Sequence, residues 1–424
     1  MLQSKLFCKT SKEISKETES VSGKLLCRAG FVSQLMAGVY TFLPLGFRVL
    51  QKIEAVIREN MAKPPVNGQE MLMPALTPKE SWQKTGRWEN FDALFKLKGR
   101  GEKDYALAST HEEVIAPLAK KIIFSYKDLP FYVFQIQTKF RNEARAKSGI
   151  LRTREFLMKD LYSFNAEEKD LDAYYDKMDE VYLRIFKEFG IRDDRSKNKI
   201  TYKTLASGGT FSKYSHEYQT VTESGEDTIY ICQKCFVAVN KEIKEKSDIC
   251  PNCGKKTSFE EKKTVEVGNI FKLGTKYSLP FGLTFRAKDG KEKPVIMGCY
   301  GLGLSRIMGA VAEVKNDKNG IIWPRNIAPY LVHLLWIENN AKVRGAAQKI
   351  YDDLQKNGVE VLYDDREDKT AGEKFVEADL IGIPFRLVVS EKTLEKNSVE
   401  IKERIEESVK LVGQSRLVKL LKMV

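Results

Sequence analysis

Two arginine-containing segments, far apart in the chain, carry residues that could together bind a triphosphate. The first contains Arg141 and Glu143 and continues through a basic stretch to Phe156. The second is the glycine-rich run 298–306, which ends at Arg306. A guanidinium is planar and permanently charged, so it grips phosphate oxygens through two parallel hydrogen bonds. We therefore predict that the two arginines clamp phosphates, while the carboxylate accepts from an amine and the phenyl ring stacks on a base.

Each segment alone has an ordinary alternative. Arg-x-Glu on a strand usually forms a cross-strand ion pair, and Gly-x-Gly-x-x-Arg occurs by chance, because short motifs carry a high false-positive risk. The glycine run is also not a dinucleotide fingerprint, since Arg306 stands where the last glycine would be. The two segments in this order, with the further segments below, favour the triphosphate site.

Length, composition and charge limit the class of protein. A chain of 424 residues should hold two or three domains, and 42% hydrophobic with 30% charged residues suits a soluble globular protein. No apolar run reaches the roughly 18 residues of a membrane helix, and the start lacks a secretory signal. We expect a cytoplasmic protein without membrane contact. The net charge of +13 favours a polyanionic partner, and the excess lies in residues 1–327, because residues 328–424 hold 16 Lys and Arg against 17 Asp and Glu.

The two arginine segments resemble the second and third signature motifs of class II aminoacyl-tRNA synthetases, and residues 38–46 with the following helical pattern resemble the first. Three more segments, 108–113, 215–218 and 297–301, closely resemble bacterial-type prolyl-tRNA synthetases. The resemblance covers nearly the whole chain. It implies a ligase that attaches L-proline to tRNA(Pro) through prolyl-adenylate, with ATP and Mg²⁺, acting as a homodimer. Only residues 165–295 separate the second and third motifs, so a full editing domain does not fit and a short form is expected.

The resemblance also implies roles for individual residues. Arg141 and Arg306 would be catalytic, neutralising charge and positioning substrates without a protein nucleophile. The implied ATP-binding residues are Arg141, Glu143, Arg152, Thr153, Phe156 and Arg306. The implied proline-binding residues are Thr110, Glu112, Arg141, His216 and Cys299, with the first two holding the ammonium. His111 is interpreted as packing support, and Cys299 could equally be a small buried hydrophobe.

The expected fold class is α+β: an antiparallel class II sheet flanked by helices, with a small insert and a C-terminal α/β domain. We predict a catalytic domain over residues 1–225 and 264–327, an insert over 226–263 and an anticodon-binding domain over 328–424. Residues 1–64 are expected to be mostly helical, and 104–164 to alternate between short strands and turns. An amphipathic helix is expected over 167–190 and another around Arg306. In the tail we expect strands at 330–337, 359–363 and 385–389, helices at 341–356 and 372–381 and a closing helix, hence a small, mainly parallel sheet.

Four cysteines form two Cys-x₂-Cys pairs that are 14 residues apart: Cys232, Cys235, Cys250 and Cys253. Two such knuckles can complete a tetrahedral zinc site, and four thiolates leave no open position, so a structural Zn²⁺ is expected rather than a catalytic one. A reducing compartment and the odd total of seven cysteines disfavour disulfides.

Two other classes of function are open at this stage. The chain could be an inactive synthetase-like paralogue that binds tRNA or a metabolite, but its intact ATP motifs argue against this. It could also be a zinc-ribbon nucleic-acid module attached to an enzyme-like scaffold. The near-neutral charge of residues 221–270, a balance of −1, argues against that.

Overall fold

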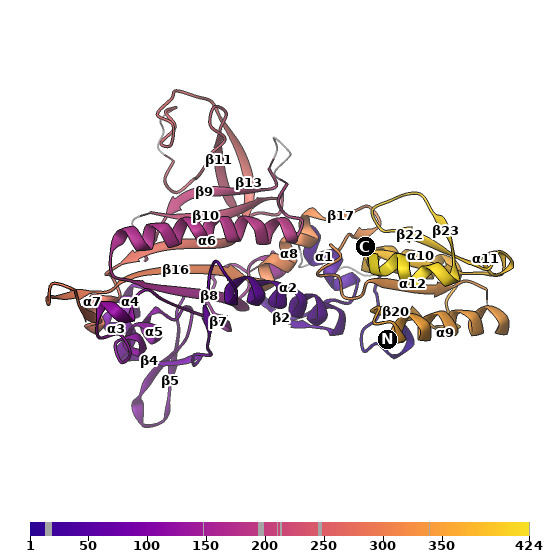
Figure 1. Cartoon of the computed structure of the whole chain (residues 1–424), viewed down its shortest axis with the longest axis horizontal. Coiled ribbons are helices and arrows are strands. Elements are labelled where there is room, and N and C mark those ends of the chain that lie inside the picture. Colours follow the sequence, from indigo (N-terminus) through magenta and orange to yellow (C-terminus); the bar gives the residue numbers. More distant parts are fainter. Residues whose placement is uncertain are drawn as a thin grey trace. The chain divides into compact units, whose positions relative to one another are not determined.

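The computed structural model describes residues 1–12, 19–146, 148–193, 199–209, 211–212, 214–244, 248–338 and 340–423. They divide into two compact units. The first comprises residues 1–35, 40–52 and 311–424, and the second comprises 36–39 and 53–310 (Figure 1). Within the described residues no helix is long and apolar enough to cross a membrane.

The second unit is built on a nine-stranded sheet with the order β10-β9-β12-β11-β13-β16-β8-β7-β3. Its centre is antiparallel, as predicted for the fold class, and brings the two arginine segments onto neighbouring strands β8 and β16. The strands are β3 (Gln69–Glu70), β7 (Phe131–Phe140), β8 (Glu155–Asn165), β9 (Thr201–Ser207), β10 (Tyr214–Val221), β11 (Asp227–Cys232), β12 (Ala238–Asn240), β13 (Phe259–Gly274) and β16 (Ile296–Gly303).

Helix α6 (Glu168–Glu188) covers one face of this sheet (Figure 1). Its apolar residues recur at helical spacing and form a single buried stripe, which is why this sequence packs as a helix on the sheet. The stripe consists of Leu171, Tyr174, Tyr175, Met178, Val181, Tyr182, Ile185 and Phe186. The prediction of a helix over 167–190 is confirmed.

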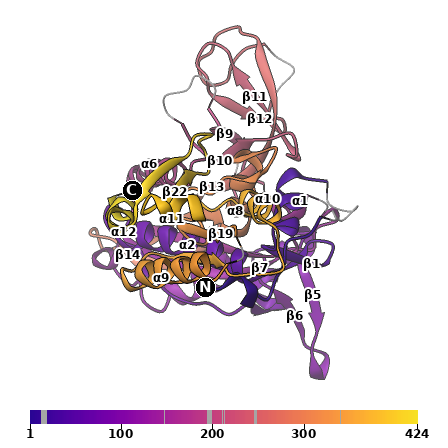
Figure 2. The same cartoon turned by 90° about the vertical axis from the view of Figure 1, so that its right-hand side faces the viewer.

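Strands β9 to β13 close into a ring, because each of the five pairs with two others. β13 pairs with β11 along its first part and with β10 along its second part, while β9 and β12 close the far side. In Figure 2 these strands gather in one group. The predicted boundary between 263 and 264 falls inside β13, so the cysteine-bearing insert shares a continuous strand with the central sheet.

Short elements surround the other face of the sheet. They are β4 (Leu76–Pro78), α3 (Lys79–Lys84), α4 (Arg87–Asn90), β5 (Phe95–Lys98), β6 (Asp104–Leu107), α5 (Glu112–Ala119), α7 (Ser278–Phe281), β14 (Thr284–Arg286) and β15 (Glu292–Pro294). The expectation that residues 104–164 would contain only strands and turns is wrong at α5, whose six-residue apolar stretch is too short to distinguish helix from strand by periodicity.

The prediction that residues 1–64 are mostly helical is wrong for residues 32–42. These form a hairpin of β1 (Val32–Met36) and β2 (Val39–Phe42), between α1 (Val21–Arg28) and α2 (Pro44–Ala62). Gly38 lies at the turn with φ +75°, and a Cβ there would stand 2.7 Å from the Ala146 side chain. Its carbonyl accepts a hydrogen bond from the Arg154 backbone at 2.7 Å, so this turn supports the loop that follows Arg141.

In the first unit, a five-stranded sheet has the order β20-β19-β21-β22-β23. The predicted strands and helices of the tail are present, and β20-β19-β21 are parallel, but the antiparallel pair β22–β23 was not predicted. The bounds are β19 (Val332–Trp336), α9 (Ala341–Lys356), β20 (Val361–Asp364), α10 (Ala371–Ile381), β21 (Phe385–Val389), α11 (Glu391–Glu395), β22 (Ser398–Glu403), β23 (Lys410–Gly413) and α12 (Gln414–Met423), preceded by β17 (Asn316–Asp317) and β18 (Gly320–Ile321).

Candidate active site

Arg141 and Arg306 line the same cavity, of about 220 Å³. Arg141 follows the end of β7, and its backbone N–H donates to the Arg154 carbonyl at 2.8 Å. Arg306 lies in the first turn of α8 (Leu304–Val314). Its Nε donates to the Leu151 carbonyl at 2.8 Å and its Nη1 to the Glu266 carbonyl at 2.9 Å. The structure therefore joins the two segments as predicted.

The Arg141 guanidinium makes no hydrogen bond or ion pair with any described side chain, and its buried Nε has no partner. It lies 5.2 Å from the centre of the Phe156 ring. Burial lowers the pKa of Arg141, and the positive charge of Arg306 lowers it further. Two cations beside one cavity, one of them without an anionic partner, make a site for a polyanion.

The loop after Arg141 is tied to the cavity by Arg152. Its Nη2 and Nε donate to Glu143 Oε2 at 2.7 and 2.9 Å, and its Nη1 donates to Glu226 Oε2 at 2.5 Å. Glu143 Oε1 accepts from no described residue, so it could still accept from an amine. Thr153 and Phe156 line a small adjoining pocket of about 20 Å³. All the residues predicted to bind ATP thus lie around two adjoining pockets.

Four acidic residues of this region were not predicted from the sequence: Glu217, Glu226, Asp227 and Glu266. Asp227 and Glu266 line the cavity with Arg306, and Glu217 lies close to both. Burial raises the pKa of the Glu217 carboxyl to about 8, and the charge of Glu266 adds to this. The sequence signal was available in Glu226-Asp227, an acidic pair after Gly225 that begins a strand. Carboxylate oxygens are the ligands that Mg²⁺ prefers, so Asp227 and Glu266 are the residues that could hold it.

Three of the predicted proline-binding residues meet in a second, apolar region of the same face. Thr110 Oγ1 donates to Glu112 Oε2, whereas the buried Glu112 Oε1 has no partner. Cys299 packs with Phe271 and Tyr277 in one apolar cluster. Burial raises the pKa of the Cys299 thiol, and the nearby charge of Glu112 raises it further. This cluster offers an apolar surface and an unpaired carboxylate oxygen to a small cationic ligand.

His111 is a buried packing residue of this region, as predicted. The side chain is fully buried; its Nε2 is 3.1 Å from the Pro74 carbonyl and its Nδ1 contacts Lys139 Nζ. Burial, followed by the charge of Lys139, lowers the pKa of His111 to about 4, so the ring is neutral and Nε2 carries the proton. Lys139 in turn pairs with Asp160 at 2.6 Å.

His216 does not lie with the other predicted proline-binding residues. Its Nδ1 is 2.7 Å from the hydroxyl of Tyr175, which belongs to α6. On the sheet, His216 is opposite Ile270, whereas Cys299 is opposite Phe271. Successive residues of a strand point to opposite faces, so His216 faces the helix and Cys299 faces the other side.

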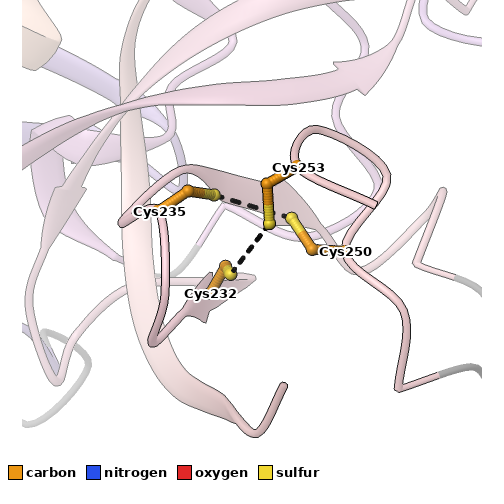
Figure 3. Close-up of side chains that lie close together, drawn as sticks. All are labelled: Cys232, Cys235, Cys250 and Cys253. Carbon is orange, nitrogen blue, oxygen red and sulfur yellow. Dashed lines mark hydrogen bonds between the residues drawn. The ribbon is translucent and has the colours of Figure 1, made fainter. Parts of the chain in front are cut away.

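The four cysteine sulfurs of the insert converge at the end of β11 (Figure 3). Cys232 and Cys253 are 4.0 Å apart between their Sγ atoms, and Cys235 and Cys250 are 3.6 Å apart. Four sulfurs at about 2.3 Å from a tetrahedral centre lie about 3.8 Å from one another. The arrangement therefore fits a tetrahedral metal ion.

Comparisons with known proteins agree with this arrangement. Residues 95–315 match the tRNA synthetase class II core domain (G, H, P, S and T), and residues 332–423 match an anticodon binding domain. The chain belongs to the class II aminoacyl-tRNA synthetases.

Among curated proteins, the chain is 35% identical to a proline--tRNA ligase of Dehalococcoides mccartyi, covering 97% of both chains, and 36% identical to one of Agrobacterium fabrum, covering 95% of this chain and 96% of the other. It is a member of the proline--tRNA ligase family. The first alignment spans 563 positions and the second 435, so this chain of 424 residues has the length of a short form.

Two solved structures share the fold. A prolyl-tRNA synthetase of Cryptosporidium parvum complexed with halofuginone and AMPPNP matches with a TM-score of 0.77 and 19% identity, over 95% of this chain and 77% of that chain. A Giardia lamblia prolyl-tRNA synthetase in complex with prolyl-adenylate matches with a TM-score of 0.76 and 21% identity, over 93% and 74%.

Proposed function

We propose that this protein activates L-proline with ATP to form prolyl-adenylate and then transfers the prolyl group to tRNA(Pro). The observation that carries the proposal is the Arg141 guanidinium, which has no anionic partner and lies beside Arg306 at one cavity. Family membership supplies the amino acid and the reaction. Glu112, with an unpaired oxygen beside an apolar cluster, supports the binding of a small cationic ring.

In the first step, the proline carboxylate attacks the α-phosphate and pyrophosphate leaves. Arg141 would bridge the attacking carboxylate and the α-phosphate, and Arg306 would neutralise charge on the phosphates. Phe156 would stack on adenine, and Thr110 and Glu112 would hold the ammonium. Mg²⁺ bound by Asp227 and Glu266 would supply further positive charge at the phosphates. In the second step, the ribose hydroxyl of the tRNA attacks the activated carbonyl.

Pyrophosphate exchange tests this assignment. The purified protein should incorporate labelled pyrophosphate into ATP only when L-proline is present, and it should charge tRNA(Pro). The other nineteen amino acids serve as controls at equal concentration. Activity with another amino acid and not with proline would reject the substrate, and no exchange with any amino acid would favour an inactive paralogue.

We also propose a structural Zn²⁺ at Cys232, Cys235, Cys250 and Cys253. The distances between the sulfurs support it. The insert also has few apolar residues, so a bound metal ion would stabilise its fold in place of a hydrophobic core. Untagged protein should contain about one zinc per chain by elemental analysis. Cys250→Ser should release it, whereas Cys27→Ser, at a cysteine outside the cluster, should retain it. Four titratable thiols without zinc in the native protein would contradict the site.

Assembly and location rest on family membership. We propose a cytoplasmic homodimer in which the segment around Gly38 contributes to the interface. Leu35 and Met36 in this hairpin are 76% and 57% exposed, which supports the placement of an apolar contact there. Sedimentation at micromolar concentration should give twice the chain mass, and an active monomer would contradict the dimer. The C-terminal domain would bind the anticodon of tRNA(Pro).

A further inference from the structure

Arg87 is a buried arginine at the edge of the amino-acid region. It begins α4 after Gly86, and only 3% of it is exposed. Its Nη1 donates to both carboxylate oxygens of Glu113, at 3.0 and 3.2 Å, and lies 3.7 Å from Glu112 Oε2. Arg87 therefore contacts both carboxylates of the first turn of α5.

Aromatic rings surround the same guanidinium. Its carbon lies 4.6 Å from the ring centre of Phe91, 4.7 Å from that of Phe211 and 5.2 Å from that of Trp82. Phe211 also packs on Phe271 of the apolar cluster, with ring centres 4.9 Å apart. Cation–π contact favours a guanidinium in this position, so Arg87 connects α4 to the loop that bears Phe211.

Several buried polar atoms of this cluster have no hydrogen-bond partner among the described residues. They are Arg87 Nε and Nη2, Glu112 Oε1 and the Tyr277 hydroxyl. Buried polar groups in native proteins are nearly always paired, so a group of unpaired ones in one place points to a polar ligand or water that completes them. Glu112 Oε1 is the atom that the proposed function assigns to the proline ammonium.

We propose that Arg87 is a positioning residue for proline binding: it holds the Glu112 and Glu113 carboxylates in place through its ion pairs and fixes Phe211 against the pocket. The proposal rests on the proposed function, because it takes Glu112 as the acceptor of the ammonium. Arg87 acts through Glu112 and Phe211.

The physical reason lies in two adjacent buried carboxylates. Burial raises the pKa of Glu113, and Arg87 is the main influence that lowers it again. Among the described residues, Arg87 is the one cation within ion-pair distance of either carboxylate. Without it, the pKa of Glu113 would rise further and both carboxylates would lose the cation that they contact. Glu112 would then no longer be held in position as the acceptor of the proline ammonium.

Other groups near the pair do not replace Arg87. Burial keeps the Tyr162, Tyr277 and Cys299 side chains neutral, because it raises the pKa of each. Lys139 is paired with Asp160. Among the described residues, the ion pairing of the two carboxylates therefore depends on Arg87.

The test compares Arg87→Met and Arg87→Lys with wild type in proline-dependent pyrophosphate exchange. Arg87→Met should raise KM for proline by about tenfold or more, the loss expected for one charged contact, while KM for ATP changes less than about twofold. The KM for proline of Arg87→Met should fall as pH rises from 6 to 8.5 more steeply than that of wild type, because the loss of Arg87 raises the pKa of Glu113 further. Arg87→Lys keeps the charge and should recover most of the proline affinity.

Controls separate this role from a folding defect. Arg58→Met removes an arginine that also pairs with two carboxylates, Glu54 and Glu70, outside the pocket, and both KM values should stay unchanged. If Arg87→Met does not fold, as judged by circular dichroism, Arg87→Lys and Thr85→Val decide. Thr85 Oγ1 donates to Glu113 at 2.8 Å, so its loss should also raise KM for proline alone. With active wild type, an unchanged proline KM in Arg87→Met, or in Thr85→Val where Arg87→Met does not fold, would overturn the proposal, whereas inactive wild type would overturn the proposed function.

Discussion

Replacing Arg141 by alanine should abolish most adenylate formation without destabilising the fold. The guanidinium has no partner among the described side chains, so its whole hydrogen-bonding capacity is available to substrates. Hydrogen bonds to charged groups are worth about 1.5–3 kcal/mol each. Losing two of them in the transition state would remove about 3–6 kcal/mol, and because about 1.4 kcal/mol is a factor of ten, kcat/KM for ATP should fall by about 10²–10⁴-fold.

The free energy of unfolding of Arg141→Ala should be equal to that of wild type or higher. Burial and Arg306 disfavour the charge of Arg141 in the free protein, so removing it relieves an unfavourable interaction. Pyrophosphate exchange measures the first effect and thermal unfolding the second. Arg184→Ala, an exposed arginine that contacts Asn60, is the matched control and should leave both unchanged. Exchange within about threefold of wild type in Arg141→Ala would refute the reasoning, because one charged contact is worth about tenfold or more.

Three further predictions concern pH, tRNA and fidelity. Burial lowers the pKa of His111, His216 and His333 to about 4, so the unfolded chain binds more protons than the folded chain between pH 4 and 6.5. The free energy of unfolding should therefore decrease by several kcal/mol as the pH falls from 6.5 towards 4, on the order of 1.4 kcal/mol for each pKa unit and each histidine. An unfolding temperature that is equal at pH 5 and 7 would contradict this. Lys369→Glu, in the loop between β20 and α10, should weaken charging of tRNA(Pro) but leave pyrophosphate exchange intact; equal tRNA KM would rule out this loop as a contact. Alanine fits any pocket that admits proline, and each missing methylene discriminates by only about 1–3 kcal/mol, so the protein should form alanyl-tRNA(Pro) and not hydrolyse it; deacylation of supplied alanyl-tRNA(Pro) above the uncatalysed rate would show editing.

The residue types that bind a triphosphate could be predicted, because charge and planarity define the chemistry whatever the fold. Arg141 and Arg306 indeed line one cavity. Helix α6 could be predicted as well, since a 3.6-residue apolar repeat over 20 residues has no strand interpretation. These are local properties of the sequence.

Properties that depend on strand pairing could not be predicted. A shift of one residue in the register of β10 would exchange the faces on which the His216 and Ser215 side chains lie. The register against β13 puts His216 on the α6 face. Arg87 was missed for a related reason: nothing near it in sequence indicates that Glu113 and Phe211 close around it. Contacts that bring residues together over 26 and 124 positions are set by the fold.

The insert shows how the two kinds of information combine. Its cysteine spacing predicted the convergence of four sulfurs, which the structure contains. Its independence from the catalytic sheet does not follow, because Thr264 of β13 pairs with Val221 of β10 and with Asp227 of β11. Strand β11 therefore begins with Asp227, which lines the cavity, and ends, five residues later, with Cys232 of the four-cysteine cluster. Since β11 pairs with β12 on one edge and with β13 on the other, we expect that a metal ion bound by the four cysteines would also stabilise one wall of the cavity. Arg141 follows β7 and lies outside the five-stranded ring, whereas Arg306 of α8 is tied to the ring because its Nη1 donates to the Glu266 carbonyl of β13.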